Sequence, residues 1–441
     1  LSTTQASNLT TDQLKALNSA QVQALTTAQL NSLSSDSVAS LDTQDVRALT
    51  SAQIKGLSSD ALVALTTAQV KALSSAQLMA LSTTQIQALE TDDLLQLSSA
   101  QLGILGTDQV KALTTTQLAS LDTNQVQSLK AAQISALSTT QVNNMTTDQV
   151  KALNSAQVRA LTTAQLNALS SDALQSLDTV DVAALNASQV KGLSSDAVAA
   201  LNTAQAGALG TAQLSALTTY QIQALETDDL AQISAALLST FTTAQASALT
   251  TTQLASLNSA QVQGLNTTQI AALTTDQVSN MTTDQIKALT SAQVRALTTA
   301  QLDKLSSDSL VAIDSADIAA LSSAQVRSLS TTAVATLTTD QVKAMTQTQL
   351  SGLSTDQMQA LETDDLLQLN TAQLGLLSTG QIRALTTHQL SNLTTDQIQG
   401  LKANQVSALS TTQASNLTTD QLKALNSAQV QALTTAQLNS L

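Results

Sequence analysis

One large apolar residue returns at every eighth position of this chain and never slips out of register. The series includes Leu9, Leu17 and Leu25 and runs to Leu441. Where Leu is absent, another large apolar residue takes its place: Met145, Ile233, Phe241, Met281, Ile313 or Met345. The consensus octad is Leu-Thr/Ser-Thr/Ser-x-Gln-Val/Leu/Ile-x-Ala, and no insertion or linker interrupts it. We therefore expect residues 1–441 to form a single continuous repeat array.

Two longer periods are superimposed on the octad. Glu-Thr-Asp-Asp-Leu begins at Glu90, Glu226 and Glu362, which are 136 residues, or seventeen octads, apart. Residues 1–33 and 409–441 are identical, which indicates a further period of 408 residues. The pattern starts and stops within a repeat, so we expect the chain to be a slice of a longer protein.

Each octad carries the signals of a helix N-terminus. In the octad that starts at Leu9, Thr10 and Gln13 match the Thr-x-x-Gln capping box, in which each side chain bonds the other residue's backbone N–H. Leu9 and Leu14 occupy the two positions of the hydrophobic staple. Of the 17 Lys and Arg residues, 14 stand at octad position seven, where a helix C-terminus favours positive charge. The octad therefore predicts one short capped helix.

Two other architectures fit the repeat less well. In one continuous helix, eight residues turn through about 800°, so the apolar stripe would drift by about 80° per octad. A β-helix needs Gly, Asn or Pro at its corners, whereas Gly56, Gly103, Gly210 and Gly380 lie at four different octad positions.

The sequence thus predicts an all-α solenoid of very short helices, one per eight-residue repeat. A helix of five to seven residues is unstable alone, so positions one, six and eight are expected to bury against neighbouring octads. Ser, Thr and Gln are expected to form most of the polar surface. The number of octads per coil stays open: two would give a flat ribbon and three a triangular tube.

Composition argues against several classes of function. The chain has no Cys and one His, His388, so we expect no cofactor, no metal centre and no catalytic triad. A net charge of −14 argues against nucleic acid as a partner. No apolar run is long enough to span a membrane. Phe241, at the Leu position, is expected in the core, whereas Tyr220 and His388, at position four, are expected to face water.

Acidic triplets are the only candidate site. They recur every 136 residues: Glu90, Asp92 and Asp93; Glu226, Asp228 and Asp229; Glu362, Asp364 and Asp365. Negative charge at a helix N-terminus explains them without any function. Contact with another chain, or Ca²⁺ binding, are the functional alternatives. Acidic pairs with the same spacing are likewise explained by negative charge at a helix N-terminus, without any function: Asp42 and Asp45, Asp178 and Asp181, Asp314 and Asp317.

The octads resemble those of very large octapeptide-repeat proteins of proteobacteria that are described as adhesin-like or haemagglutinin-like. The resemblance covers the whole chain and is clear in Leu-Thr-Thr-Ala-Gln-Leu-Asn-Ser-Leu (25–33) and Leu-Thr-Ser-Ala-Gln-Val-Arg-Ala-Leu (289–297). It implies an extracellular or cell-surface location.

The leading functional hypothesis is a structural, non-enzymatic stalk, fibre or filament that associates with copies of the same chain. The alternative is an adhesin or binding module whose surface contacts a receptor, a glycan or ice.

Overall fold

The computed structural model describes residues 1–441 and contains 55 helices and no strand. Helix αn begins at residue 8n − 5, so every octad forms one helix that starts at octad position three. Most helices are six residues long and end at position eight, as in α9 (Thr67–Ala72). The five-residue helices are α1, α2, α3, α5, α8, α13, α18, α19, α25, α26, α35, α38, α42, α50, α51 and α52, and the four-residue helices are α4, α27, α30, α47 and α55. The predicted all-α class, with one helix per repeat, is confirmed.

The capping box forms as the sequence predicts. The Gln13 backbone N–H donates to Thr10 Oγ1 at 3.3 Å, and the Thr10 N–H donates to Gln13 Oε1 at 3.0 Å. Asn and Asp act in the same way, as where the Gln125 N–H donates to Asp122 at 2.7 Å. Where position two has no capping side chain, as at Lys130, the Gln still accepts from the backbone N–H, at 2.6 Å. The hydrogen bond from the backbone N–H of position two to the Gln side chain therefore does not require a capping side chain at position two.

The chain turns between helices without any special backbone conformation. Leu73, after α9, has φ −59° and ψ 133°, and the next N-cap, Ser74, has φ −73° and ψ 160°. Two extended residues in succession redirect the chain before the next helix begins. No residue has positive φ, so the turns do not require glycine. This explains why the glycines occupy no fixed octad position.

Contacts along the chain set the size of the coil. Within each unit, most helices pack against the helix three places further along, as α6 (Thr43–Ala48) does against α9. Hydrogen bonds between successive turns join residues 25 to 31 positions apart, such as Asn31 to Gly56 and Gln69 to Val38. Three octads are 24 residues and four are 32, so one turn takes between three and four octads. The two-octad ribbon is excluded.

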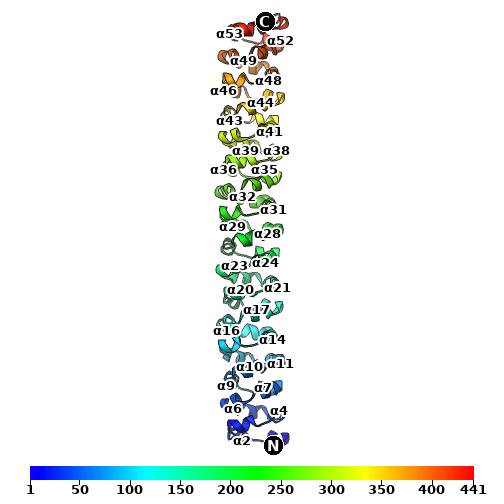
Figure 1. Ribbon diagram of the computed structural model, residues 1–441, viewed down its shortest axis with the longest axis vertical. Coiled ribbons are helices and arrows are strands. Elements are labelled where there is room, and N and C mark those ends of the chain that lie inside the picture. Colours follow the sequence, from blue (N-terminus) through cyan, green and yellow to red (C-terminus); the bar gives the residue numbers. More distant parts are fainter. The chain divides into compact units, whose positions relative to one another are not determined.

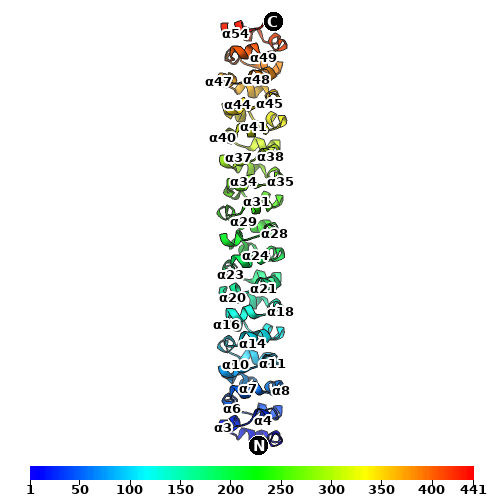
Figure 2. The same cartoon turned by 45° about the vertical axis from the view of Figure 1, so that its right-hand side comes forward.

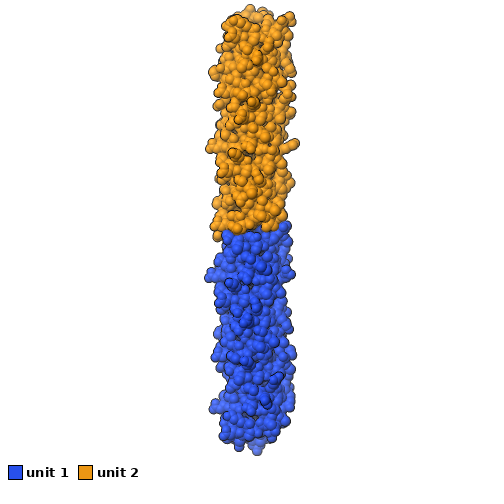
Figure 3. Space-filling model, turned by 90° about the vertical axis from the view of Figure 1, so that its left-hand side faces the viewer, with its two compact units in different colours: residues 1–225 blue, residues 226–441 orange.

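The structure divides into two compact units, residues 1–225 and residues 226–441 (Figure 3). Within each unit the short helices wind around a common axis (Figures 1 and 2). Helices continue at the octad spacing on both sides of the boundary, with α28 (Thr219–Ala224) followed by α29 (Thr227–Gln232). That the array acts as one domain stays a prediction.

The core of each unit is a thin aliphatic column. Octad position six is its centre, with Leu14, Val70 and Ile286 at most 1% exposed. Position one lies beside it and is also buried. Position eight was expected in the core, but it is only half-buried or exposed, as at Ala72 and Gly56. The third buried position is position five, which is Gln in most octads.

Loss of one capping hydroxyl should have a small, local effect. Thr282 Oγ1 accepts from the Gln285 N–H at 3.2 Å at the start of α36 (Thr283–Ala288). We expect Thr282→Ala to lower the free energy of unfolding by about 1 kcal/mol, measured by chemical denaturation. Thr283→Ala is the matched control, because Thr283 is exposed and caps nothing. Equal effects of the two changes would contradict the capping role.

Candidate functional site

The Gln at octad position five links successive turns of the coil. In α9, Gln69 Oε1 accepts from the Thr66 N–H at 2.7 Å, which completes the capping box. Its Nε2 donates to the backbone carbonyls of Val38, at 3.0 Å, and Leu41, at 2.7 Å, in the preceding turn. An amide side chain has one acceptor oxygen and two N–H donors. All three have hydrogen-bond partners in Gln69, although the residue is only 1% exposed.

The same bonds recur in both units with the same spacing. In the second unit, Gln357 donates to Val326 O at 3.1 Å and to Leu329 O at 2.7 Å, which lie 31 and 28 residues earlier. Val326 lies in the last turn of α41 (Ser323–Ser328), where its carbonyl also accepts from the Leu329 N–H at 3.2 Å, and Leu329 is the residue that follows the helix. The expectation that Gln is a surface residue is therefore wrong for most of the Gln residues at position five. Gln caps its own helix and satisfies the carbonyl groups of the turn before.

The acidic triplets occupy the start of α12 (Thr91–Gln96), α29 and α46 (Thr363–Gln368). The Glu at position two and the Asp at position four of each triplet are exposed. The Asp at position five is buried, because it replaces the Gln: Asp93, Asp229 and Asp365 are 2%, 2% and 3% exposed. The Oδ2 atom of each of these three residues has no hydrogen-bond partner.

Burial changes the acidity of these three carboxyl groups. It raises the pKa of Asp93 from 3.8 to about 6, and the nearby charges of Glu90 and Asp92 add to the rise, while a hydrogen bond from the Glu90 backbone opposes it. The pKa of Asp229 and that of Asp365 are also raised to about 6, again mainly by burial. The triplets therefore combine two charged surface residues with one buried group that titrates near neutral pH.

The acidic pairs are arranged differently, although they too place Asp at position five. Asp45 accepts a hydrogen bond from Ser19 Oγ at 2.8 Å, and Asp181 accepts one from Ser155 Oγ at 2.5 Å. Asp317 accepts from Ser291 in the same way. Each donor lies 26 residues before its Asp, in the preceding turn. These carboxylates thus have the partner that the triplet carboxylates lack.

The remaining predicted residues lie on the expected sides of the chain. Phe241 is buried at 3% exposure, whereas Tyr220 is 75% exposed and His388 is also exposed. An open surface hollow of about 540 Å³ between α46 and α49 (Thr387–Asn392) is lined in part by Glu362, Asp364 and His388. No three His, Asp or Glu side chains are placed to hold a metal ion together.

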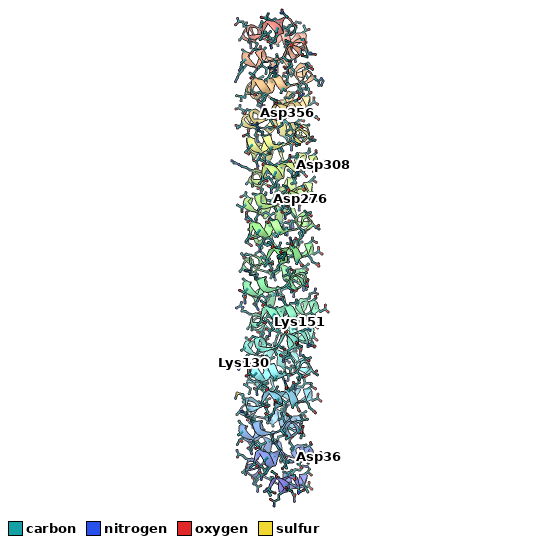
Figure 4. The ribbon with its side chains drawn as sticks, turned by 90° about the vertical axis from the view of Figure 1, so that its right-hand side faces the viewer. Asp36, Lys130, Lys151, Asp276, Asp308 and Asp356 are labelled. Atoms are coloured by element: carbon teal, nitrogen blue, oxygen red, sulfur yellow. The ribbon has the colours of Figure 1, made fainter.

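Charged side chains are otherwise scattered over the outer surface of each unit. Figure 4 labels Asp36, Lys130 and Lys151 in the first unit and Asp276, Asp308 and Asp356 in the second, all exposed. Two close ion pairs form, Lys304 with Asp303 and Lys423 with Asp420, and both are well exposed. Exposed pairs add little to stability, so charge does not hold the coil together.

Comparison with protein families identifies the repeat. The model of the ALTTAQ repeat matches most of the chain, at residues 7–43, 38–75, 62–91, 86–123, 118–155, 145–179, 174–211, 200–227, 253–283, 278–312, 310–347 and 358–395. The chain belongs to the ALTTAQ repeat family. No match is found among curated proteins.

The residues of the ALTTAQ motif have distinct structural roles. Ala64-Leu65-Thr66-Thr67-Ala68-Gln69 is one copy of the motif. Leu65 is a core residue, Thr66 caps α9, and Gln69 both completes the cap and donates to the preceding turn. The ALTTAQ motif therefore contains the cap, a core residue and the link between turns. None of the helices has the length and apolar character needed to cross a bilayer.

Proposed function

We propose that this ALTTAQ repeat chain is a structural, non-catalytic part of an extracellular or cell-surface protein, in which the number of octads sets the length of a stalk, fibre or filament. The regular Gln bonds between turns are the observation that supports the proposal most. Each octad contacts the adjoining octads and octads three or four places away, and these contacts repeat along the chain, so octads can be added without changing the fold. The resemblance to adhesin-like repeat proteins of bacteria supports the location.

We further propose that copies of the chain associate through the exposed acidic residues of the triplets: Glu90, Asp92, Glu226, Asp228, Glu362 and Asp364. These side chains are exposed, and the exposed Lys and Arg residues at octad position seven supply charges of the opposite sign on a second copy. Such contacts between solvated charges are weak singly and weaken further in salt. Recurrence every 136 residues offers the same contact several times along one chain, which strengthens association through avidity.

Replacing these six exposed acids by Gln or Asn is expected to shorten or abolish lateral assemblies of the full chain. The measurement is electron microscopy together with sedimentation velocity at low and high salt. The control variant replaces six other exposed acids by Asn: Asp12, Asp36, Asp148, Asp172, Asp284 and Asp308. Unchanged assembly in the triplet variant, or equal loss in the control, would refute the contact.

The alternative function, binding of a receptor, a glycan or ice, predicts a chain that binds its ligand without assembling. Glycan-array binding and a thermal-hysteresis measurement test it directly. Ice binding is disfavoured because the hydroxyls of cap residues such as Thr66 accept backbone hydrogen bonds. Antibody labelling of intact cells of the source organism tests the surface location.

A further inference from the structure

The buried Asp of the first triplet interrupts the hydrogen bonds between turns. In the octad before Asp93, Gln85 donates to the carbonyls of Ile54, at 2.8 Å, and Leu57, at 2.9 Å. In the octad after it, Gln101 donates to Leu73 O at 3.1 Å. The same register places Asp93 over the carbonyls of Leu62 and Leu65, but an ionised carboxylate has no hydrogen to donate.

The second unit repeats this arrangement at Asp365. Gln357, one octad earlier, donates to Val326 O and Leu329 O, and Gln373, one octad later, donates to Met345 O at 3.3 Å. The register places Asp365 over the carbonyls of Val334 and Leu337. Asp229 occupies the same octad position, and its Oδ2 is likewise buried without a partner. At Asp93 and Asp365, a carboxylate oxygen is buried without a donor, which is costly.

No positive charge compensates the three carboxylates. Two helices pack on α12: α9, whose one charged residue is Lys71, and α15 (Thr115–Ser120), which has no charged residue. The helix before α9, α8 (Ser59–Val63), has one charged residue, Asp60. On α46 pack α43 (Thr339–Ala344), which has Asp340 and Lys343, and α49, which has His388. On α29 packs α32 (Thr251–Ser256), which has no charged or titratable residue. None of these groups forms an ion pair with the buried Asp. The charges that act on each buried Asp are the two acids of its own triplet.

We propose that Asp93 and Asp365 are proton-binding joints, at which the hydrogen bond between turns is absent while the carboxyl group is ionised and forms when the group takes up a proton. Asp229 is buried in the same way and is expected to take up a proton with them. A protonated carboxyl has an O–H that can donate toward the carbonyls of the preceding turn, in the role that the Gln amide has elsewhere. Proton uptake also removes a buried charge. Asp45, Asp181 and Asp317 are not joints of this kind, because a Ser hydroxyl already donates to each.

The direction of the pH effect follows from the pKa values. Each folded-state pKa, about 6, lies above the unfolded value of 3.8, so the ionised form is less stable in the folded protein. Stability is therefore lowest above the folded pKa and rises as the pH falls from about 7 to about 4. The change occurs close to neutral pH, within a range that the environment of a protein can reach.

Thermal unfolding of the full chain, followed by circular dichroism in the presence of a chelator, tests the joints. We expect the midpoint to rise by on the order of 5 °C between about pH 7.5 and about pH 5. Combined Asp93→Asn, Asp229→Asn and Asp365→Asn should raise the midpoint at neutral pH by a similar amount and remove the pH dependence. Combined Asp45→Asn, Asp181→Asn and Asp317→Asn is the matched control, and it should keep the pH dependence of the unchanged protein.

Three results would overturn the proposal. The first is an unfolding midpoint that does not change with pH, and the second is a pH dependence of the midpoint that remains in the triplet variant. The third is a midpoint at neutral pH that rises to its low-pH value when millimolar CaCl₂ replaces the chelator. The last result would assign the closing of the joint to a metal ion. Carbon-13 NMR of the Asp carboxyl groups in the unchanged protein is the second measurement. It should show three groups that titrate near pH 6, and the absence of any group titrating above about pH 5 would also refute the joints.

Discussion

Gln157→Glu is expected to lower the free energy of unfolding by about 3–5 kcal/mol at neutral pH, although the two side chains have nearly the same shape. Gln157 is 1% exposed, and its Nε2 donates to Val126 O at 2.9 Å and to Leu129 O at 2.7 Å. Glutamate would place an oxygen against both carbonyls and bury an unpaired charge. Urea denaturation monitored by circular dichroism measures the loss.

Two matched variants separate the causes of that loss. Gln157→Met removes the polar atoms but adds no charge, so it should cost less than Gln157→Glu at neutral pH. Gln127→Glu changes an exposed residue at position seven and should cost close to nothing. Burial raises the pKa of the introduced carboxyl, so the cost of Gln157→Glu should shrink as the pH falls. Equal costs for Gln157→Glu and Gln127→Glu would show that the bonds between turns do not hold the coil.

Deletion of half an octad is expected to cost on the order of 5 kcal/mol or more, whereas deletion of a whole octad should be nearly neutral. Removing residues 115–118 deletes Leu118, which is 1% exposed, and Gln117, which donates to Ile86 O at 2.9 Å and to Leu89 O at 2.6 Å. It also leaves two Leu residues four positions apart, so one helix is lost and the register breaks.

Removing residues 113–120 instead joins octads 105–112 and 121–128, which both keep Leu at position one, Gln at position five and Val at position six. Each Gln after the deletion then meets a carbonyl pair from an octad of the same kind, because the bonds between turns span a fixed number of octads. Thermal unfolding and helix content of the two variants, measured side by side, test this. Similar losses in both variants would show that the contacts depend on individual residues and not on the octad register.

The buried role of Gln could have been suspected from the sequence. A capping box accepts either Glu or Gln at its third helical position, yet position five of this chain never holds Glu. The use of Gln and never Glu indicates that the N–H₂ group is needed, as at Gln69, whose Nε2 donates to two carbonyls. The acceptors lie 28 and 31 residues away, however, and no local pattern points to them.

The burial of one Asp in each triplet is another feature that local sequence patterns do not reveal. The sequence singles out their nine acidic residues by recurrence, but it treats each triplet as one cluster. The structure separates them, since Glu90 and Asp92 are exposed while Asp93 is buried without a partner for Oδ2. This separation follows from octad position five being internal, which depends on how one turn of the coil covers the next.

The sequence by itself determined the local features of the octad: the helix start at position three, the cap at position two, the buried Leu at position one, and the all-α class. These depend on residues within a few positions of one another, so side-chain chemistry and spacing are sufficient. Only the tertiary structure decided that a turn takes between three and four octads, that Gln is internal and that Asp93 lacks a partner. Those features depend on contacts between residues 25 to 31 positions apart. The geometry of these contacts is set by the change of chain direction at each Leu and the N-cap residue after it, which accumulates from octad to octad.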